Sequence, residues 1–165
     1  MSLRRAVAGI LGTGMLAITP AGAAPPAKVS TSPWKFIRTV DKMTDEINCR
    51  LDFPTKKVML SFQGPKIYVV TGHYLGLDDS SNLLLARVDQ NAPLSLSVRV
   101  VTGQLGAIGD TKDISNLVEQ LRSGKSIRVR ILPAGGPSME EDVANIEGFS
   151  PAYRRFEACV ERTSP

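Results

Sequence analysis

The sequence is poor in the residues that build metal sites, because its 165 residues include only two cysteines and one histidine. A zinc site made of cysteines alone needs about four of them, and sites with several histidines are excluded by count. Two cysteines also cannot build a scaffold of several disulfides. We therefore expect no metal site and no cofactor in this chain.

Side chains suited to catalysis are equally scarce. His73 is the one side chain whose ordinary pKa lies near neutrality, and a serine hydrolase would depend on it. The Gly-x-Ser-x-Gly segment that presents a nucleophilic serine does not occur. We expect His73 to be a surface residue at the end of a strand and the protein not to be an enzyme. A hydrolase that uses His73 is the alternative within the enzyme class.

The overall composition is that of one globular domain, with 42% hydrophobic, 22% charged and 5% aromatic residues. These fractions exclude a disordered or fibrous chain, and the length suits one domain rather than two. The formal net charge of +4 is also compatible with a nucleic-acid-binding protein. Part of that charge, however, belongs to the N-terminus.

Residues 1–23 have the three-part pattern of a secretory signal peptide. Arg4 and Arg5 precede an apolar run at residues 6–18, and Ala21-Gly22-Ala23 supplies small residues before the cleavage site. The run is too short to span a bilayer, which takes about 20 apolar residues. We predict cleavage between Ala23 and Ala24 and a periplasmic location, with release from the cell as the alternative.

Removal of residues 1–23 leaves 18 basic and 16 acidic residues, a net charge of +2. A nearly neutral domain lacks the positive surface that nucleic-acid binding requires, so we expect no nucleic-acid partner. Residues 24–33, rich in proline, serine and alanine, are predicted to be an extended leader. Residues 34–165 then form a single β-rich domain without a transmembrane segment.

Alternation of apolar and polar residues predicts that most of this domain is β-strand. Cys49, Leu51 and Phe53, for example, share one face of a strand. Residues 63–65 are predicted to be a hairpin turn, and residues 103–109, with three glycines, a loop. The predicted strands are residues 34–40, 47–53, 58–62, 66–71, 83–89, 94–102, 126–132 and 143–147.

Two helices are expected to pack on the strands. Asp113 is the predicted N-cap of the first, which ends at Gly124, a residue able to take a positive φ. Ser150 is the predicted cap of the second, after a turn at Gly148 and with Phe149 fastening the helix to the sheet. We predict a mainly β fold: an antiparallel sandwich-like sheet with one intermediate helix and one C-terminal helix.

The two cysteines are predicted to lie on core-facing surfaces, Cys49 on an early strand and Cys159 on the last helix. In an oxidising compartment two such residues are expected to form a disulfide. It would close a segment of about 110 residues and contribute about 4–5 kcal/mol through chain entropy. Free buried cysteines and a redox-active thiol are the alternatives, the latter without the usual Cys-x-x-Cys pattern.

Three polar segments could act as ion-binding or pairing surfaces. The basic residues Lys125, Arg128 and Arg130 could contact an anion or lipopolysaccharide, although a solvated strand face is favoured. Residues 78–82 carry oxygen ligands for calcium, but they lack EF-hand spacing and are typical of a turn. Arg87 and Asp89 share a strand face and could form an ion pair.

Two stretches resemble known proteins. Leu121-Arg-Ser-Gly-Lys at a helix end, a basic-apolar strand and Gly148-Phe-Ser-Pro-Ala-Tyr at a helix start resemble the C-terminal half of the invasion-associated locus B family of proteobacterial envelope proteins. Trp34, then Met43-Thr-Asp, then Cys49 is similar to a pattern in small secreted proteins, including some accessory proteins of type VI secretion loci. The resemblance implies a periplasmic, non-catalytic, β-rich protein and carries over no catalytic residues.

We therefore expect a secreted periplasmic protein that acts through protein–protein or cell-envelope interaction. The alternative within the binding class is an envelope inhibitor or a small-ligand-binding protein. An exposed loop at residues 74–82 or 103–109 would then make the contact.

Overall fold

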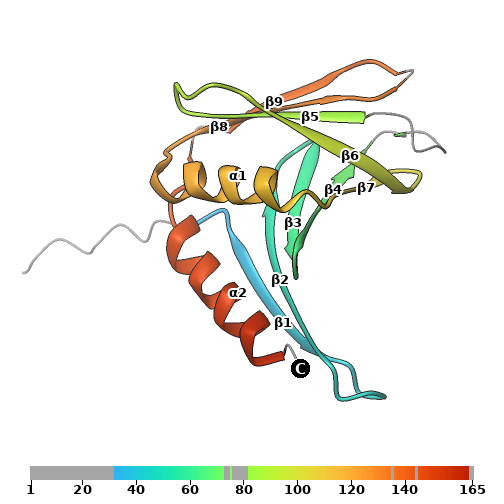
Figure 1. Ribbon diagram of the computed structural model, residues 1–165, viewed down its shortest axis with the longest axis vertical. Helices are drawn as coiled ribbons and strands as arrows, with labels where there is room; N and C mark the ends of the chain where they lie inside the picture. The colour runs from blue at the N-terminus through green and yellow to red at the C-terminus, as the bar shows by residue number, and fades with distance from the viewer. Residues whose placement is uncertain (1–31, 73–74, 76–81, 135, 144, 164–165) are drawn as a thin grey trace, which may run out of the picture. The chain divides into compact units, whose positions relative to one another are not determined.

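The computed structural model describes residues 32–72, 75, 82–134, 136–143 and 145–163. Within them, nine strands form one antiparallel sheet in the order β1-β2-β3-β4-β7-β6-β5-β8-β9 (Figure 1). The strands are β1 Lys35–Val40, β2 Ile47–Pro54, β3 Val58–Gln63, β4 Lys66–Thr71, β5 Asn82–Val88, β6 Leu94–Thr102, β7 Leu105–Ile108, β8 Ile127–Leu132 and β9 Met139–Val143. The helices are α1 Thr111–Ser123 and α2 Phe149–Thr163. This confirms the mainly β fold class with an intermediate and a C-terminal helix.

The apolar side chains of every second strand residue point into the core, as the alternation in the sequence predicts. In β5, buried residues alternate with half-buried ones from Asn82 to Val88. α1 contributes Leu117, Val118 and Leu121 to the same apolar core, and α2 contributes Phe149, Phe156 and Cys159. The sheet and both helices therefore share one core.

Trp34 joins the start of the sheet to the start of α2. Its ring stacks on Phe53 with centroids 4.4 Å apart and meets Phe149 edge-on at 4.7 Å. Its indole Nε1 donates to the buried carbonyl oxygen of Ile146 at 2.9 Å. Gly148 turns the chain into α2 with φ +87, so the predicted roles of Gly148 and Phe149 are confirmed.

Two strand predictions were wrong. The predicted loop at residues 103–109 contains β7, because the turn after β6 takes only Gly103 and Gln104, with φ +30 at Gly103. Gly106 lies inside β7, where a Cβ would approach Val98 Cγ1 to 2.2 Å, so this glycine serves close packing. The predicted strand at 143–147 is instead β9 at Met139–Val143. Three consecutive acidic residues interrupt the apolar alternation that would predict a strand in this segment, although charged residues are typical of an edge strand.

Both predicted helix caps were also wrong. α1 begins earlier than expected, because Asp110 is its N-cap and accepts a hydrogen bond from the Asp113 backbone N at 3.0 Å. Ser150 lies inside α2 and does not cap it. Its hydroxyl donates to the Arg122 carbonyl oxygen at 3.0 Å, which links the end of α1 to the start of α2.

Gly124 ends α1 for a reason different from the predicted positive φ. Its φ is −76, which any residue adopts, but a Cβ at this position would lie 2.3 Å from Val88 Cγ1 and 3.2 Å from Ile146 Cδ1. The Val88 side chain is fully buried and stiff at χ1. Glycine is therefore required at this position because the Cβ of any other residue would clash with Val88.

Gly124→Ala is expected to lower the free energy of unfolding by about 1–3 kcal/mol, the usual cost of overpacking. Gly109→Ala is the matched control, because no described atom lies within 4 Å of a Cβ added there. Urea unfolding followed by circular dichroism would measure both variants. Equal losses in the two variants would contradict the assigned contact with Val88.

Candidate functional site

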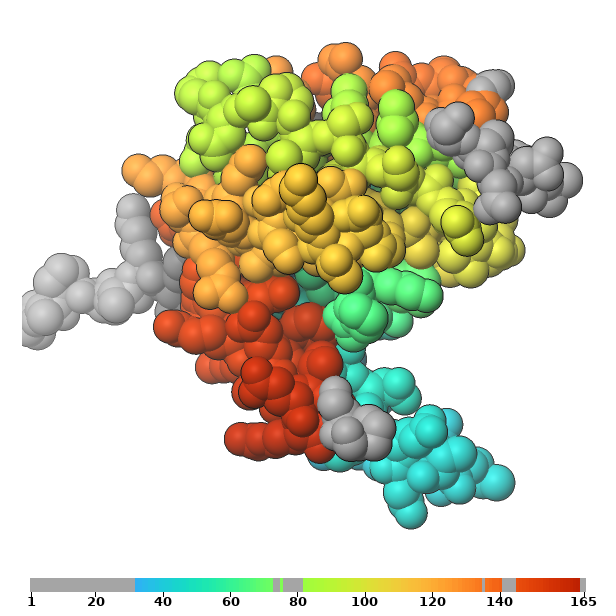
Figure 2. Space-filling view, viewed as in Figure 1, coloured from blue at the N-terminus to red at the C-terminus, as the bar shows by residue number. Residues whose placement is uncertain are grey.

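The Cys49–Cys159 disulfide fastens α2 to the sheet. It joins β2 to α2 with the two Cα atoms 6.0 Å apart and a sequence separation of 110 residues. α2 runs beside β1 and β2 (Figure 1). On the face shown in Figure 2, α1 and α2 lie side by side, and Arg122 Nη2 of α1 lies 3.2 Å from Glu157 Oε1 of α2. The predicted disulfide is therefore present in place of free buried cysteines.

A groove of about 400 Å³ lies between the strands and α2, beside this disulfide. We call it the β1–α2 groove. It is lined by Phe36, Arg38 and Ile47 from the strands, and by Arg155, Ala158 and Arg162 from the helix, together with Cys159 and Thr163. Its composition is amphipathic: apolar side chains flanked by three guanidinium groups.

The fold brings the three arginines together in a simple way. Arg38 lies opposite Cys49 in the β1–β2 register, so their side chains share the face that α2 covers. Arg155 and Arg162 precede and follow Cys159 at helical spacing, so they flank it on one stripe of α2. The disulfide that joins Cys49 to Cys159 therefore places guanidinium groups on both sides of the groove.

These three arginines have no counter-charge in the part of the chain that the structure describes. None of them takes part in an ion pair there. No acidic side chain is among the residues that line the groove. All three side chains are exposed. An incoming anion would therefore meet three positive charges without displacing a carboxylate.

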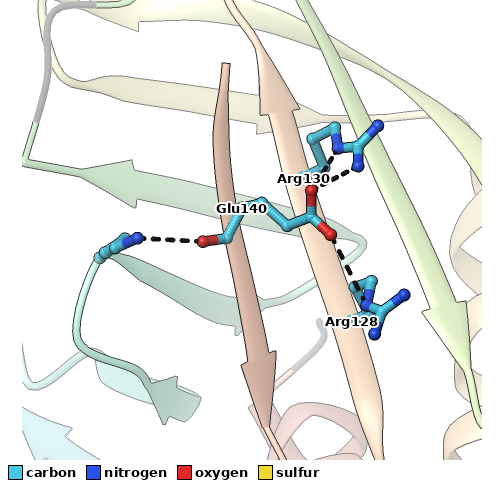
Figure 3. Close-up of polar contacts among 4 residues, drawn as sticks. Arg128, Arg130 and Glu140 are labelled. Carbon is cyan, nitrogen blue, oxygen red and sulfur yellow. Dashed lines mark hydrogen bonds and ion pairs between the residues drawn. The ribbon is translucent and has the colours of Figure 1, made fainter. Parts of the chain in front are cut away.

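The predicted basic surface on β8 is arranged differently. Arg128 Nε lies 3.6 Å from Glu140 Oε1, and Arg130 Nε donates to Glu140 Oε2 at 2.8 Å (Figure 3). Glu140 belongs to β9 and lies directly opposite Arg130 in the register. Lys125 is not on the strand, which begins at Ile127. An anion on this surface would have to compete with the Glu140 carboxylate, which already lies between the two guanidinium groups.

A second acid on the sheet is also satisfied internally. Asp52 is 5% exposed. Its carboxylate accepts from Ser61 Oγ at 2.7 Å and pairs with Arg50 Nε at 3.0 Å. No pattern in the sequence predicts this cluster, and each of its charged groups has a partner. It is explained by the burial of Asp52, because a buried carboxylate requires hydrogen bonds and a counter-ion.

The predicted pairing of Arg87 with Asp89 is wrong. Arg87 Nε donates to the Asn91 carbonyl oxygen at 3.1 Å. Asp89 has a positive φ of 50, and its carboxylate accepts from the Ser126 backbone N at 2.8 Å and from Ser126 Oγ at 2.9 Å. It also accepts from the Lys125 backbone N at 3.1 Å. The hydrogen bonds from Ser126, and then that from Lys125, hold the pKa of the Asp89 carboxyl below its ordinary value.

Asp89 is expected to make stability depend on pH in the acid range. Because its pKa is lower in the folded state, its contribution is complete above the unfolded-state pKa of about 3.9 and is lost as the pH falls through the folded-state pKa. Asp89→Asn keeps the positive φ accessible but removes the charge. The difference in unfolding free energy between wild type and Asp89→Asn should therefore be larger at neutral pH than at about pH 3.

Urea unfolding at both pH values measures this difference. The control is Glu119→Gln, which changes an exposed carboxylate that has no hydrogen bond among the described residues. A gap between wild type and Asp89→Asn that is the same at both pH values would contradict the assigned role of Asp89.

Several predicted residues lie outside the described part of the chain. These are the signal peptide with its Ala23–Ala24 cleavage site, His73, and residues 78–81 of the calcium hypothesis. Asn82 is described: it is fully buried, and its Oδ1 accepts from the Ala134 backbone N at 3.0 Å, a structural role. Of the two proposed contact loops, residues 103–109 form the turn and strand described above. Among the described helices, none is long and apolar enough to cross a membrane.

Comparisons with known proteins bear on the fold. No family model matches the sequence, and no curated protein matches it. The solved structure of invasion associated protein B from Bartonella henselae is similar, with a TM-score of 0.54 and 19% sequence identity, over 81% of this chain and 96% of that chain. At this identity the likeness establishes the fold. The resemblance to the invasion-associated locus B family is confirmed at that level, whereas the resemblance to secretion accessory proteins stays a prediction.

Proposed function

We propose that this chain is a member of the invasion-associated locus B family that is exported to the periplasm and acts without catalysis, by binding another protein of the cell envelope. The observation that carries the proposal is the β1–α2 groove, where three arginines without a described ion-pair partner surround apolar side chains. Exposed apolar surface surrounded by uncompensated charge is typical of a binding site, because a complementary partner can bury the apolar groups and pair with the charges.

Three further observations support export. The signal-peptide pattern of residues 1–23 directs a chain to the secretion machinery. The disulfide joins residues 110 positions apart, and such bonds persist in oxidising compartments such as the periplasm. The fold is that of a protein described as invasion associated. Cleavage between Ala23 and Ala24 is expected, and the intact mass of the protein recovered from the periplasmic fraction would test it.

The binding role is tested by capture of envelope proteins on the immobilised oxidised protein. The variant carries Arg38→Glu, Arg155→Glu and Arg162→Glu. The control is Arg154→Glu, which changes an exposed arginine on the same helix that does not line the groove. A partner retained by wild type and the control but lost by the triple variant is the expected result. Capture that is identical for all three proteins, or absent for all, would contradict a binding function of this groove.

A further inference from the structure

The β1–α2 groove lies next to an open edge of the sheet. β1 is the first strand in the order, so on its far side it pairs with no strand in the described part of the chain. Natural proteins often protect such an edge with proline, a bulge or charged side chains. The charged side chains of β1 are Lys35 and Arg38, which would repel a basic strand but not an acidic one. β1 contains no proline, and its six residues pair with β2 without a register shift. Its edge is therefore a regular template for another strand.

The direction of the free backbone groups follows from the register. The Asp41 backbone N donates to the Glu46 carbonyl oxygen at 2.8 Å, which marks these two residues as a hydrogen-bonded pair at the end of the β1–β2 hairpin. Hydrogen-bonded pairs recur at every second residue of an antiparallel ladder. Lys35, Ile37 and Thr39 therefore turn their backbone groups toward β2. Phe36, Arg38 and Val40 turn theirs toward the open edge.

The same three residues point their side chains to the face covered by α2. Phe36 and Arg38 line the groove, and Val40, on the same face, is 46% exposed. A strand added to β1 would thus place alternate side chains directly beside Phe36, Arg38 and Val40, and within the groove flanked by Arg155 and Arg162. Apolar, acidic and apolar side chains would match these three positions in turn.

We infer that the β1–α2 groove binds an extended acidic segment of a partner protein, which adds to the edge of β1 as a tenth strand and places an acidic side chain among Arg38, Arg155 and Arg162. The inference rests on the binding function proposed above and specifies its partner. Main-chain hydrogen bonds supply affinity in strand addition, and pockets for alternate side chains supply specificity. The pattern recognised is apolar-x-acidic-x-apolar.

The leader of this chain does not fit the same site. Residues 24–31 contain two prolines, one lysine and no acidic residue. Prolines lack the backbone N–H that strand addition requires, and a lysine would repel the three arginines. The charge of the groove therefore favours a segment from another protein.

The probe is a labelled synthetic peptide, acetyl-Thr-Leu-Thr-Glu-Thr-Val-Thr-amide, whose binding to the oxidised protein is followed by fluorescence polarisation. Two matched peptides separate the contributions: one has lysine in place of glutamate, and the other is N-methylated at the glutamate. We expect the acidic peptide to bind and the lysine peptide to bind at least about tenfold more weakly, the worth of one charge-assisted hydrogen bond. The N-methylated peptide should also bind at least about tenfold more weakly, because it lacks a main-chain donor and its methyl group crowds the strand edge.

Protein variants complete the test. Arg155→Glu with Arg162→Glu should weaken binding of the acidic peptide by about tenfold or more, while Arg154→Glu should leave it unchanged. Equal binding of the acidic and lysine peptides, equal binding of the N-methylated peptide, or no saturable binding up to about 1 mM would each overturn strand addition.

Binding of the protein to phosphatidylglycerol vesicles is measured in a separate experiment. Vesicle binding that depends on the three arginines, without peptide binding, would overturn strand addition in favour of a lipid surface. The capture experiment tests the proposed function independently of the peptide experiment. Groove-dependent capture of an envelope protein together with failure of the peptide would reject only the strand-addition mode, whereas failure of both experiments would reject the proposed function as well.

Discussion

Removal of the Cys49–Cys159 disulfide is expected to lower the free energy of unfolding by about 4–5 kcal/mol. The bond closes a loop with a sequence separation of 110 residues, and the entropy removed from the unfolded chain grows with loop length. Single domains have total stabilities of about 5–15 kcal/mol. Loss of this one bond is therefore expected to remove about a quarter or more of the stability of the protein.

The double variant Cys49→Ser, Cys159→Ser is preferable to either single variant, which would leave one reactive thiol. Urea unfolding, with and without reductant, should show a large drop in the midpoint for wild type and none for the double variant. The fluorescence of Trp34, the only tryptophan in the sequence, reports the transition. A midpoint of wild type that does not respond to complete reduction would contradict the prediction.

Reduction should also affect binding. The disulfide holds α2 against β1 and β2, and the three arginines of the groove lie on both sides of it. A reduced protein that stays folded at low temperature is therefore expected to lose peptide affinity before it loses its strand content. Circular dichroism and fluorescence polarisation on the same sample would separate the two effects.

Trp34→Ala is expected to lower the free energy of unfolding by about 3–5 kcal/mol, the usual cost of truncating a buried large aromatic residue. The Trp34 side chain is buried, stacks on Phe53 and contacts Phe149, so its removal leaves a cavity between the sheet and the start of α2. It also leaves the buried Ile146 carbonyl oxygen without the indole donor.

The Trp34→Phe variant separates these contributions. It keeps an aromatic ring but removes the indole N–H, so the loss should be smaller, about 1–3 kcal/mol for an unsatisfied buried acceptor. Because both variants lack tryptophan, circular dichroism must follow unfolding. We expect wild type to be the most stable and Trp34→Ala the least. A Phe variant as unstable as the Ala variant would assign the whole effect to the hydrogen bond.

Sequence patterns predict the strands well where one face is apolar and the other polar, as in β2, β4 and β6. They fail at β7 and β9. In β7, Gly106 is selected by the close approach of Val98, a contact between neighbouring strands that a local pattern cannot contain. In β9, three acidic residues in a row reflect its edge position, which depends on the complete strand order.

Local sequence patterns also fail to predict the whole β1–α2 groove, because it combines residues of two distant elements. Part of it can nevertheless be predicted from the sequence. The predicted disulfide already joins Cys49 to Cys159. Arg155 and Arg162 flank Cys159 at helical spacing. Only the β1–β2 register, which places Arg38 opposite Cys49, completes the set. The spacing of Arg155 and Arg162 around Cys159 therefore already predicts that two of the three arginines lie beside the disulfide.

The contacts of Trp34 and Ser32 with residues 146 and 147 bear on how the chain acquires its structure. Trp34 Nε1 bonds to Ile146 across 112 residues, and Ser32 Oγ donates to the Glu147 carbonyl oxygen across 115. During folding, the apolar face of the first strand therefore stays uncovered until almost the last segment of the chain is in place. Such long-range closure is slow and leaves unpaired strand edges exposed in the meantime. The contacts of Trp34 and Ser32 therefore make the folding of the first strands depend on a nearly complete chain.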